Sequence, residues 1–280
     1  MARLSDILLT AIAPAIWGST YIITTELLPP GHPITVAMIR TLPAGLILLA
    51  LLRAVPSGIW VMRSFILGAL NFTIFQTLLF VSAYRLPGGI AATMGAVQPL
   101  IVIFVAAMIL KRPVRTGAIL AALAGLIGVG LLVLQSHARL DVLGILAALG
   151  GALSMAFGTV LTRKWSPAIS PLVLTSWQLT AGGLLLLPIA LIFEPPLPHL
   201  TPANLGGFAY LILLTALTYV LWFRGVARLE PSAVSTLSFL SPFVAILLGW
   251  AILGQALSGL QIAGAVIVVL SIVASQRVAR

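Results

Sequence analysis

Ten long apolar runs, separated by prolines, glycines or charged residues, divide the chain almost evenly. Each run approaches the roughly 20 residues that a helix needs to cross the hydrocarbon core of a bilayer. The connectors are short, so neighbouring spans must lie antiparallel. The pattern therefore predicts an all-α integral membrane protein of ten transmembrane helices, at residues 7–27, 34–52, 65–84, 88–110, 116–134, 143–162, 171–193, 204–223, 232–253 and 259–275.

The composition leaves no room for a soluble alternative. Of the 280 residues, 61% are hydrophobic and only 7% are charged, whereas soluble domains carry about 25% charged residues. A soluble protein of this size could not bury so much apolar surface. Ten spans use about 200 residues, which leaves enough for loops but not for a separate soluble domain. The chain has no cysteine, which excludes disulfide, iron–sulfur and thiol chemistry.

The positive charges predict the orientation. The formal net charge is +10, but the charges lie at span ends, so they indicate membrane orientation and not nucleic-acid binding. One side of the predicted topology carries twelve of the fifteen basic residues, the other side carries Arg85 and Arg139, and Arg40 lies inside a span. By the positive-inside rule we expect both termini in the cytoplasm, together with Arg3, Arg53, Arg63, Lys111, Arg112, Arg115, Arg163, Lys164, Arg224, Arg228, Arg277 and Arg280.

The chain also contains an internal repeat. Phe80, Arg85 and Pro99 recur as Phe223, Arg228 and Pro242, each at an offset of 143 residues. The first span of each half carries a related triplet, Trp17-Gly18-Ser19 and Phe157-Gly158-Thr159. The predicted halves are residues 6–135 and 143–276 with five spans each, and because five is odd the second half must enter the membrane inverted. Inverted repeats are typical of secondary transporters, whose substrate site lies near the midplane between the halves.

This arrangement resembles the drug/metabolite transporter superfamily, and within it the EamA family. The resemblance rests on the two five-span halves, the Trp/Phe-Gly-Ser/Thr triplets, the mid-span prolines, and the segments Ala83-Tyr-Arg-Leu-Pro and Ala227-Arg-Leu-Glu-Pro. The chain is most similar to YddG-type amino-acid exporters, which implies export of amino acids, aromatic ones among them, and of other metabolites. It departs from the family at Lys111-Arg112-Pro113, where a Gly-Glu pair is common, and at Gln255.

Pro99 and Pro242 each fall in the middle of a predicted span, at equivalent positions of the two halves. Proline has no N–H and clashes with the carbonyl four residues before it, so Pro99 and Pro242 should free the carbonyls of Gly95 and Ser238. Unpaired backbone groups at membrane depth are tolerated where they line a cavity. We expect the two broken helices to face each other and line the substrate cavity, with Pro99, Pro242, Gly18 and Gly158 as hinges; the alternative is two ordinary kinks sealed by neighbouring helices.

Polar and aromatic residues at similar depth are the candidate substrate-binding residues. Some of them could simply join helices by hydrogen bonds. Arg40, about 10 Å into its span, either meets a substrate carboxylate or snorkels outward to Glu26 and the headgroups. The candidates are Trp17, Ser19, Arg40, Asn71, Gln76, Gln98, Thr159, Gln178, Tyr219, Trp222, Ser238 and Ser241.

Missing residues narrow the substrate. No Asp or Glu lies at mid-span, which argues against a buried proton-carrying carboxylate, and no cationic cluster lies there to bind phosphate groups. The three histidines, His32, His137 and His199, are scattered in loops, where we expect them to be exposed, and they predict no metal site. No P-loop motif is present, so we expect no cofactor. A neutral cavity with aromatic walls suits small zwitterions or uncharged metabolites.

We therefore predict a secondary transporter in the plasma membrane, or in the inner membrane of a bacterium, that works by alternating access as its halves rock about the central site. Small residues at helical spacing, such as Gly117, Ala121 and Gly125, favour packing within a monomer over a dimer contact. The rival predictions are a membrane enzyme acting on lipid or prenyl substrates, a channel, and a transporter of other drugs or metabolites.

Overall fold

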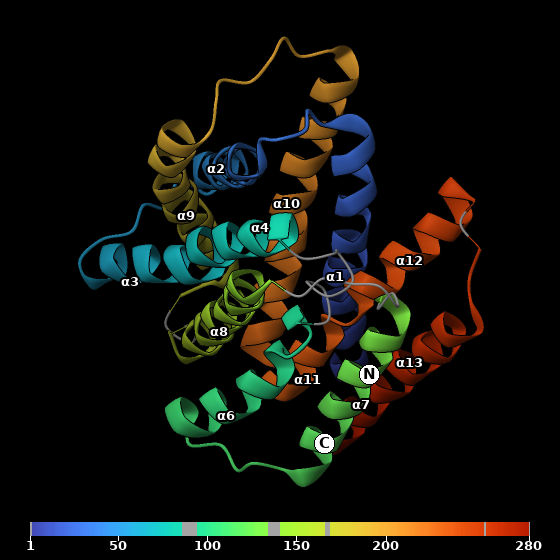
Figure 1. Cartoon of the computed structure of the whole chain (residues 1–280). Coiled ribbons are helices and arrows are strands. Elements are labelled where there is room, and N and C mark those ends of the chain that lie inside the picture. The colour runs from blue at the N-terminus through green and yellow to red at the C-terminus, as the bar shows by residue number, and fades with distance from the viewer. Residues whose placement is uncertain (1, 86–93, 134–140, 166–168, 255, 280) are drawn as a thin grey trace.

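The computed structural model describes residues 2–85, 94–133, 141–165, 169–254 and 256–279, and within these residues every regular element is helical. The first repeat contains α1 (Ala2–Leu27), α2 (Pro33–Leu52), α3 (Ile59–Gly68), η1 (Ala69–Ile74), α4 (Phe75–Arg85), α6 (Gln98–Leu110) and α7 (Thr116–Val133). The second contains α8 (Val142–Trp165), α9 (Pro171–Phe193), α10 (Pro202–Arg228), α11 (Pro231–Leu237), α12 (Leu240–Leu253) and α13 (Gly259–Val278). Figure 1 shows these helices as one bundle.

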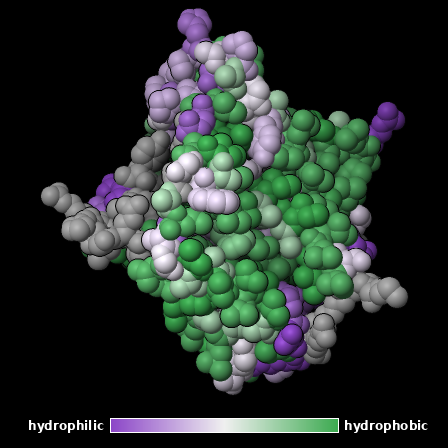
Figure 2. Space-filling model, turned by 90° about the vertical axis from the view of Figure 1, so that its right-hand side faces the viewer, coloured by the Kyte–Doolittle hydropathy of each residue, from purple (hydrophilic) through white to green (hydrophobic). Residues whose placement is uncertain are grey.

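The predicted membrane spans are confirmed. Nine helical segments in the described residues are long and apolar enough to cross a bilayer, and the shorter apolar helix α6 belongs to the tenth span. Part of that predicted span, 88–110, lies outside the described residues. Large apolar side chains are exposed on the outside of the bundle, for example Leu51 (75%), Met108 (66%) and Leu260 (67%). Figure 2 shows the resulting apolar surface across the middle of one face, with hydrophilic residues gathered towards its top and lower edge.

The third span is not the uniform α-helix that its sequence predicted. Residues Ala69–Ile74 form a π-helical segment between α3 and α4. Such segments widen one turn of a helix and often occur at functional sites. Here the segment carries Asn71 and Phe72, whose side chains are both fully buried.

The spans that contain Pro99 and Pro242 are broken, as predicted, whereas Pro14, Pro43 and Pro188 lie inside continuous helices. α6 begins at Gln98 with Pro99 in its first turn, where the missing N–H costs nothing. In the second repeat, α11 ends at Leu237 and α12 begins at Leu240, with Pro242 in its first turn. The prediction of a free Ser238 carbonyl is wrong, because a tight turn lets the Ser241 N–H donate to it at 3.0 Å.

The spans pair with a two-fold pattern that reflects the repeat. α1 packs on α10 and α12, and in the same way α8 packs on α4 and α6. Spans in equivalent positions of the two repeats pack on each other, α2 on α9 and α7 on α13. Glycines allow close approach here, since a Cβ at Gly128 would lie 3.0 Å from the Gly264 carbonyl.

The small residues of α7 pack inside the chain. A Cβ at Gly117 would meet the Val278 side chain, and one at Gly125 would meet the Phe239 ring. Gly259 on α13 has no neighbour within 4 Å of its Cβ position. The α7 stripe therefore makes contacts within one chain.

Both termini lie at the same end of the bundle. Asp6 on α1 pairs with Arg228 at the end of α10, and Ala279 shares a small crevice with Glu230, which precedes α11. We call this end the terminal end and the other the opposite end.

Candidate functional site

An aromatic cluster fills the centre of the bundle. The rings of Trp17 on α1 and Trp222 on α10 lie 5.2 Å apart, and Trp17 also lies 5.0 Å from Tyr219. Phe72 from the π segment meets Tyr219 edge-on at 4.7 Å and Phe223 at 6.4 Å. Tyr219, Trp222, Phe72 and Phe223 are all at most 2% exposed. Both repeats therefore contribute to one set of packed rings, which are favourable in such tilted and edge-on arrangements.

Arg40 points into this cluster. Its guanidinium lies near the hydroxyl of Tyr219, whose side chain is buried. Glu26, the partner that we expected, is an exposed side chain near the end of α1. The inward direction of Arg40 argues against simple snorkelling and gives the cluster a permanent positive charge.

Polar groups complete the surroundings of Arg40. The Gln76 amide nitrogen donates to Thr41 Oγ1 at 3.4 Å, and the Trp17 indole N–H donates to Thr218 Oγ1 at 3.0 Å. Gln76 and Tyr219 occupy equivalent positions of the two repeats, at the offset of 143, and both are buried.

Three polar atoms in this part of the described chain are buried without a hydrogen-bond partner: Arg40 Nε, Gln76 Oε1 and Trp222 Nε1. An unsatisfied buried donor or acceptor costs about 1–3 kcal/mol, so native proteins rarely keep several together without a reason. The set offers two donors and one acceptor. It could hold an anionic group at Arg40 and Trp222 and a donor group, such as an ammonium, at Gln76.

A second polar cluster lies next to the first, on the other side of the π segment. The Asn71 amide nitrogen donates to Gln178 Oε1 at 2.8 Å and to Thr162 Oγ1 at 3.2 Å. Asn71 Oδ1, Gln178 Nε2 and Thr159 Oγ1 are buried without a partner in the described chain. This cluster joins η1, α8 and α9, so it links the two repeats through amides and hydroxyls.

The remaining predicted residues, Ser19, Ser238, Ser241 and Gln98, have other surroundings. Ser19 bonds to the Ile16 carbonyl at 2.7 Å and to the Tyr210 hydroxyl at 2.6 Å. Ser238 donates to the Ser235 carbonyl within its own turn, and Ser241 is half-buried. Gln98, at the start of α6, is buried and its Nε2 has no partner among the described residues.

The predicted hinge positions have clear local surroundings. A Cβ at Gly18 would lie 2.7 Å from the Ser241 carbonyl oxygen, so this glycine lets α1 touch the first turns of α12. Gly158 lies inside the continuous helix α8, directly against Asn71. Both glycines therefore have a packing reason that is independent of any bending.

The site is sealed on the terminal side. Val226, Leu229, Val234 and Leu237 are at most 5% exposed and form a hydrophobic cluster with Trp222 and Phe223. These residues lie on α10, on α11 and on the turn between them. Among the described residues, these apolar side chains pack against one another between the aromatic cluster and the terminal end.

The histidine prediction needs one correction. His32 is buried, not exposed, and its ring nitrogens contact the carbonyls of Pro30 at 2.8 Å and Pro196 at 3.3 Å. Within the part of the chain that the structure describes, no three His, Cys, Asp or Glu side chains form a group that could hold a metal ion.

Sequence reasoning missed Phe72, Thr41 and Thr218, which surround the predicted residues. Nothing in the sequence distinguishes Phe72 from Phe65 in the same span, although the first is fully buried and the second is 39% exposed. Thr41 follows Arg40 directly, so its proximity to the site could have been found from that neighbour.

Comparison with known proteins supports a single family. Residues 4–134 and residues 142–275 each match the model of the EamA-like transporter family. Protein PecM of Dickeya dadantii (strain 3937) is 45% identical over 91% of this chain and 87% of its own length. The uncharacterized inner membrane transporter YedA of Escherichia coli (strain K12) is 27% identical over 88% of this chain and 82% of its own. One crystal structure has a TM-score of 0.84 over 99% of both chains at 20% identity, which shows a shared fold.

Proposed function

Because the chain belongs to the EamA-like transporter family, we propose that it exports small zwitterionic metabolites, and amino acids in particular, by alternating access. The single observation that carries the substrate class is the combination of one cation, Arg40, with buried rings and an unpaired amide oxygen at Gln76. The family assignment makes the protein a transporter, so a membrane enzyme acting on lipid or prenyl substrates is excluded.

The protein is a multi-pass protein of the plasma or inner membrane, given its apolar helices and its inner-membrane relative. We place the terminal end in the cytoplasm, as the excess of basic residues at that end favours. The apolar layer of Val226, Leu229, Val234 and Leu237 then lies between Trp222 and the cytoplasm, where it closes the path to the site.

The chemistry of the site suits a free amino acid. Arg40 and the Trp222 indole N–H offer donors to a carboxylate, and hydrogen bonds to charged groups contribute about 1.5–3 kcal/mol each. Gln76 Oε1 offers an acceptor to the ammonium group. The rings of Trp17, Phe72 and Tyr219 offer apolar faces to a side chain, which favours aromatic or large apolar amino acids.

The proposed energy source rests on the placement of the acidic residues. The acidic residues are Asp6, Glu26, Asp141, Glu194 and Glu230, and all of them lie at span ends or in loops. A proton-coupled carrier would need an acid that titrates within reach of the substrate site. Diffusion of the substrate down its own gradient is therefore the simplest proposal.

The test is uptake of labelled amino acids into proteoliposomes with no ion gradient imposed. We expect saturable uptake, with KM raised roughly 10- to 100-fold in Arg40→Gln, the equivalent of the charged hydrogen bond that is lost. Arg63→Gln is the matched control, because Arg63 stacks over Trp60 and Trp165 away from the site. A folded protein that takes up no amino acid would reject this substrate class and leave other drugs or metabolites to be tried.

A further inference from the structure

A crevice at the terminal end lies between residues of the two repeats. The connection between α6 and α7 contributes Arg112 and Arg115 to its lining, and the residue before α11 contributes Glu230. Both arginines are exposed, whereas Ile103 and Ala118, which also line the crevice, are buried. The crevice therefore combines charged residues at the surface with apolar residues deeper in.

The connection between α6 and α7 is basic throughout. Residues 111–115 read Lys-Arg-Pro-Val-Arg, all five are exposed, and none is acidic. The equivalent residues of the second repeat, 254–258 at the offset of 143, read Gly-Gln-Ala-Leu-Ser and carry no charge. The same connection therefore forms without basic residues. The positive-inside rule favours such residues at this end, but it does not require them to line a crevice.

Lys111 adopts a backbone conformation that favours glycine. It ends α6 in the left-handed region, with φ 52° and ψ 37°, and its counterpart Gly254 ends α12 in the same region, with φ 65° and ψ 20°. A side chain is unfavourable there, and glycine is the usual residue at such a helix end. The first repeat thus has a lysine where the second has glycine, and strained residues of this kind cluster at functional sites.

Arg112 and Arg115 are placed to bind an anion at the crevice. Arg112 Nη1 lies 3.8 Å from Glu230 Oε1, which is beyond hydrogen-bond distance, and 53% of the Arg112 side chain is exposed. Arg115 Nη1 donates to the Val278 carbonyl, which fixes this arginine with one of its five N–H donors. Two guanidinium groups at one crevice suit a phosphate group, because arginine can bind phosphate through two parallel hydrogen bonds.

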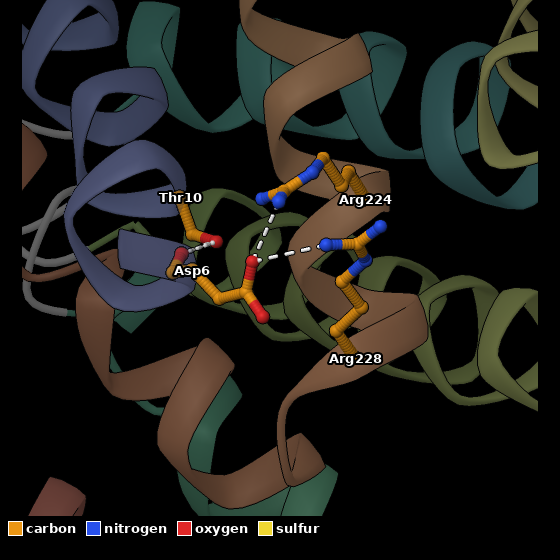
Figure 3. A network of polar contacts seen from close by, with 4 residues as sticks. All are labelled: Asp6, Thr10, Arg224 and Arg228. Atoms are coloured by element: carbon orange, nitrogen blue, oxygen red, sulfur yellow. Dashed lines mark hydrogen bonds and ion pairs between the residues drawn. The ribbon is translucent and has the colours of Figure 1, made fainter. Parts of the chain in front are cut away.

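Other arginines are held more closely by acids of the chain. Figure 3 shows the Asp6 carboxylate directed at Arg224, at 2.6 Å, and at Arg228, at 3.3 Å. At the opposite end of the bundle, Asp141 pairs with Arg85 at 3.5 Å. Asp6 and Asp141 lie at the start of the first span of each repeat, and Arg228 and Arg85 are related by the offset of 143. Both acids approach their arginines more closely than the acid of the crevice does.

The crevice borders the apolar outer surface of the bundle. Met108 near the end of α6, Val114 in the connection and Leu120 near the start of α7 are all exposed. Figure 1 shows this connection along the lower edge of the bundle. A ligand bound here meets acyl-facing side chains and cationic groups together. Basic pockets between membrane helices bind anionic lipid headgroups in this way, whereas a free phosphate ion would use only the arginines.

We infer that the crevice binds the headgroup of an anionic phospholipid. The phosphate lies between Arg112 and Arg115, and the acyl chains follow the exposed faces of α6 and α7. With Lys111, the connection supplies three positive charges against the one carboxylate of Glu230, so an anionic headgroup is favoured over a zwitterionic one. This lipid site is separate from the aromatic cluster and does not depend on the substrate proposed above.

Native mass spectrometry of the purified protein in detergent tests the site. The probes are phosphatidylglycerol and phosphatidylcholine with the same acyl chains, added in equal amounts. Because attraction to anionic lipid grows about five-fold per basic residue at a membrane surface, we expect the phosphatidylglycerol adduct to be favoured at least about five-fold. Equal adducts of the two lipids would overturn the inference.

Removal of the two crevice arginines is the first variant. Arg112→Gln combined with Arg115→Gln should reduce the preference for phosphatidylglycerol to within about two-fold. The matched control is Arg53→Gln combined with Lys164→Gln, which removes two charges from exposed positions at the same end that do not line the crevice. The control should keep the original preference. A preference that survives in the crevice variant, or falls equally in both, would assign the attraction to the whole basic end and reject the site.

Glu230→Gln tests the site while both arginines stay in place. The Glu230 side chain provides no cap for α11, so this variant should fold even if the double variant does not. Loss of the carboxylate that faces Arg112 should raise the preference for phosphatidylglycerol about two- to five-fold. An unchanged or lower preference would contradict the inference.

Inorganic phosphate separates a lipid site from a site for a free anion. It is added in large excess over the lipid, at constant ionic strength, to the unmodified protein. The phosphatidylglycerol adduct should persist, because the acyl chains contribute to binding. Displacement of the lipid by phosphate would identify a site for the free ion and rule out the lipid.

Discussion

The Asn71 side chain occupies the space that any side chain at residue 158 would need. A Cβ at Gly158 would lie 2.1 Å from Asn71 Oδ1, a distance that no real contact allows. The two residues come from different repeats, and the π segment brings Asn71 to this position. Gly158, the middle residue of the Phe157-Gly158-Thr159 triplet, therefore leaves the space that an amide from the first repeat occupies.

Replacing Gly158 with Ala should therefore destabilise the protein. We expect a loss of about 1–3 kcal/mol, as for other overpacked cores, with disruption of the Asn71–Gln178 hydrogen bond. Thermal unfolding in detergent measures the change. Gly206→Ala is the control, because a Cβ at Gly206 on α10 has no neighbour within 4 Å, and the substitution should be neutral or stabilising by up to about 1 kcal/mol.

The Trp17–Thr218 hydrogen bond should contribute measurably to the contact between α1 and α10. Trp17→Phe and Thr218→Val each remove one partner of a 3.0 Å bond. We expect a coupling free energy of about 0.5–1.5 kcal/mol in a double-mutant cycle. Additive effects of the two substitutions on the unfolding free energy would show that the bond does not hold these helices.

The two symmetry-related acids should differ in their contribution to stability. Asp6 is 15% exposed and meets two arginines, so Asp6→Asn should cost about 1–3 kcal/mol by leaving those charges uncompensated. Asp141 and Arg85 are 39% and 45% exposed, and water screens such pairs to about 0–1 kcal/mol. Unfolding of Asp141→Asn is the comparison, and equal losses in both variants would contradict this assignment.

Glu194 should stabilise the start of α2 from a distant loop. Its two carboxylate oxygens accept from the Ile34 N–H at 2.6 Å and from the Thr35 N–H at 2.7 Å, while His32 provides no side-chain cap. Glu194→Ala should cost about 1–2 kcal/mol, as for the loss of other helix caps.

Hydrogen exchange at Ile34 and Thr35 measures this effect locally. We expect both amides to exchange faster in Glu194→Ala. His199→Ala, an exposed position in the same connection, should leave their exchange unchanged. Exchange that stays slow in Glu194→Ala would mean that the α2 start is held by other contacts.

Much of the candidate site could be predicted from the sequence. Because a polar residue in an apolar span needs a partner, the pattern predicted Arg40, Gln76, Asn71 and Gln178 as site residues. The structure buries Gln76, Asn71 and Gln178 to 1% exposure or less. The same pattern of polar residues does not predict in which direction each side chain points. Ser238 has the same polar character, yet its hydroxyl bonds within its own turn.

By itself the sequence determined the spans, the breaks before Pro99 and Pro242, and the repeat. Bilayer thickness fixes the length of an apolar helix, and proline lacks a backbone donor. The repeat singled out Pro99 and Pro242, because Pro14, Pro43 and Pro188 lie inside continuous helices. Only the tertiary structure decided the π segment at Ala69–Ile74, the pairing of Arg40 with Tyr219, and the packing of α1 on α10 across the repeats. These features join residues far apart in the chain, and they depend on which helix faces fit together at close range.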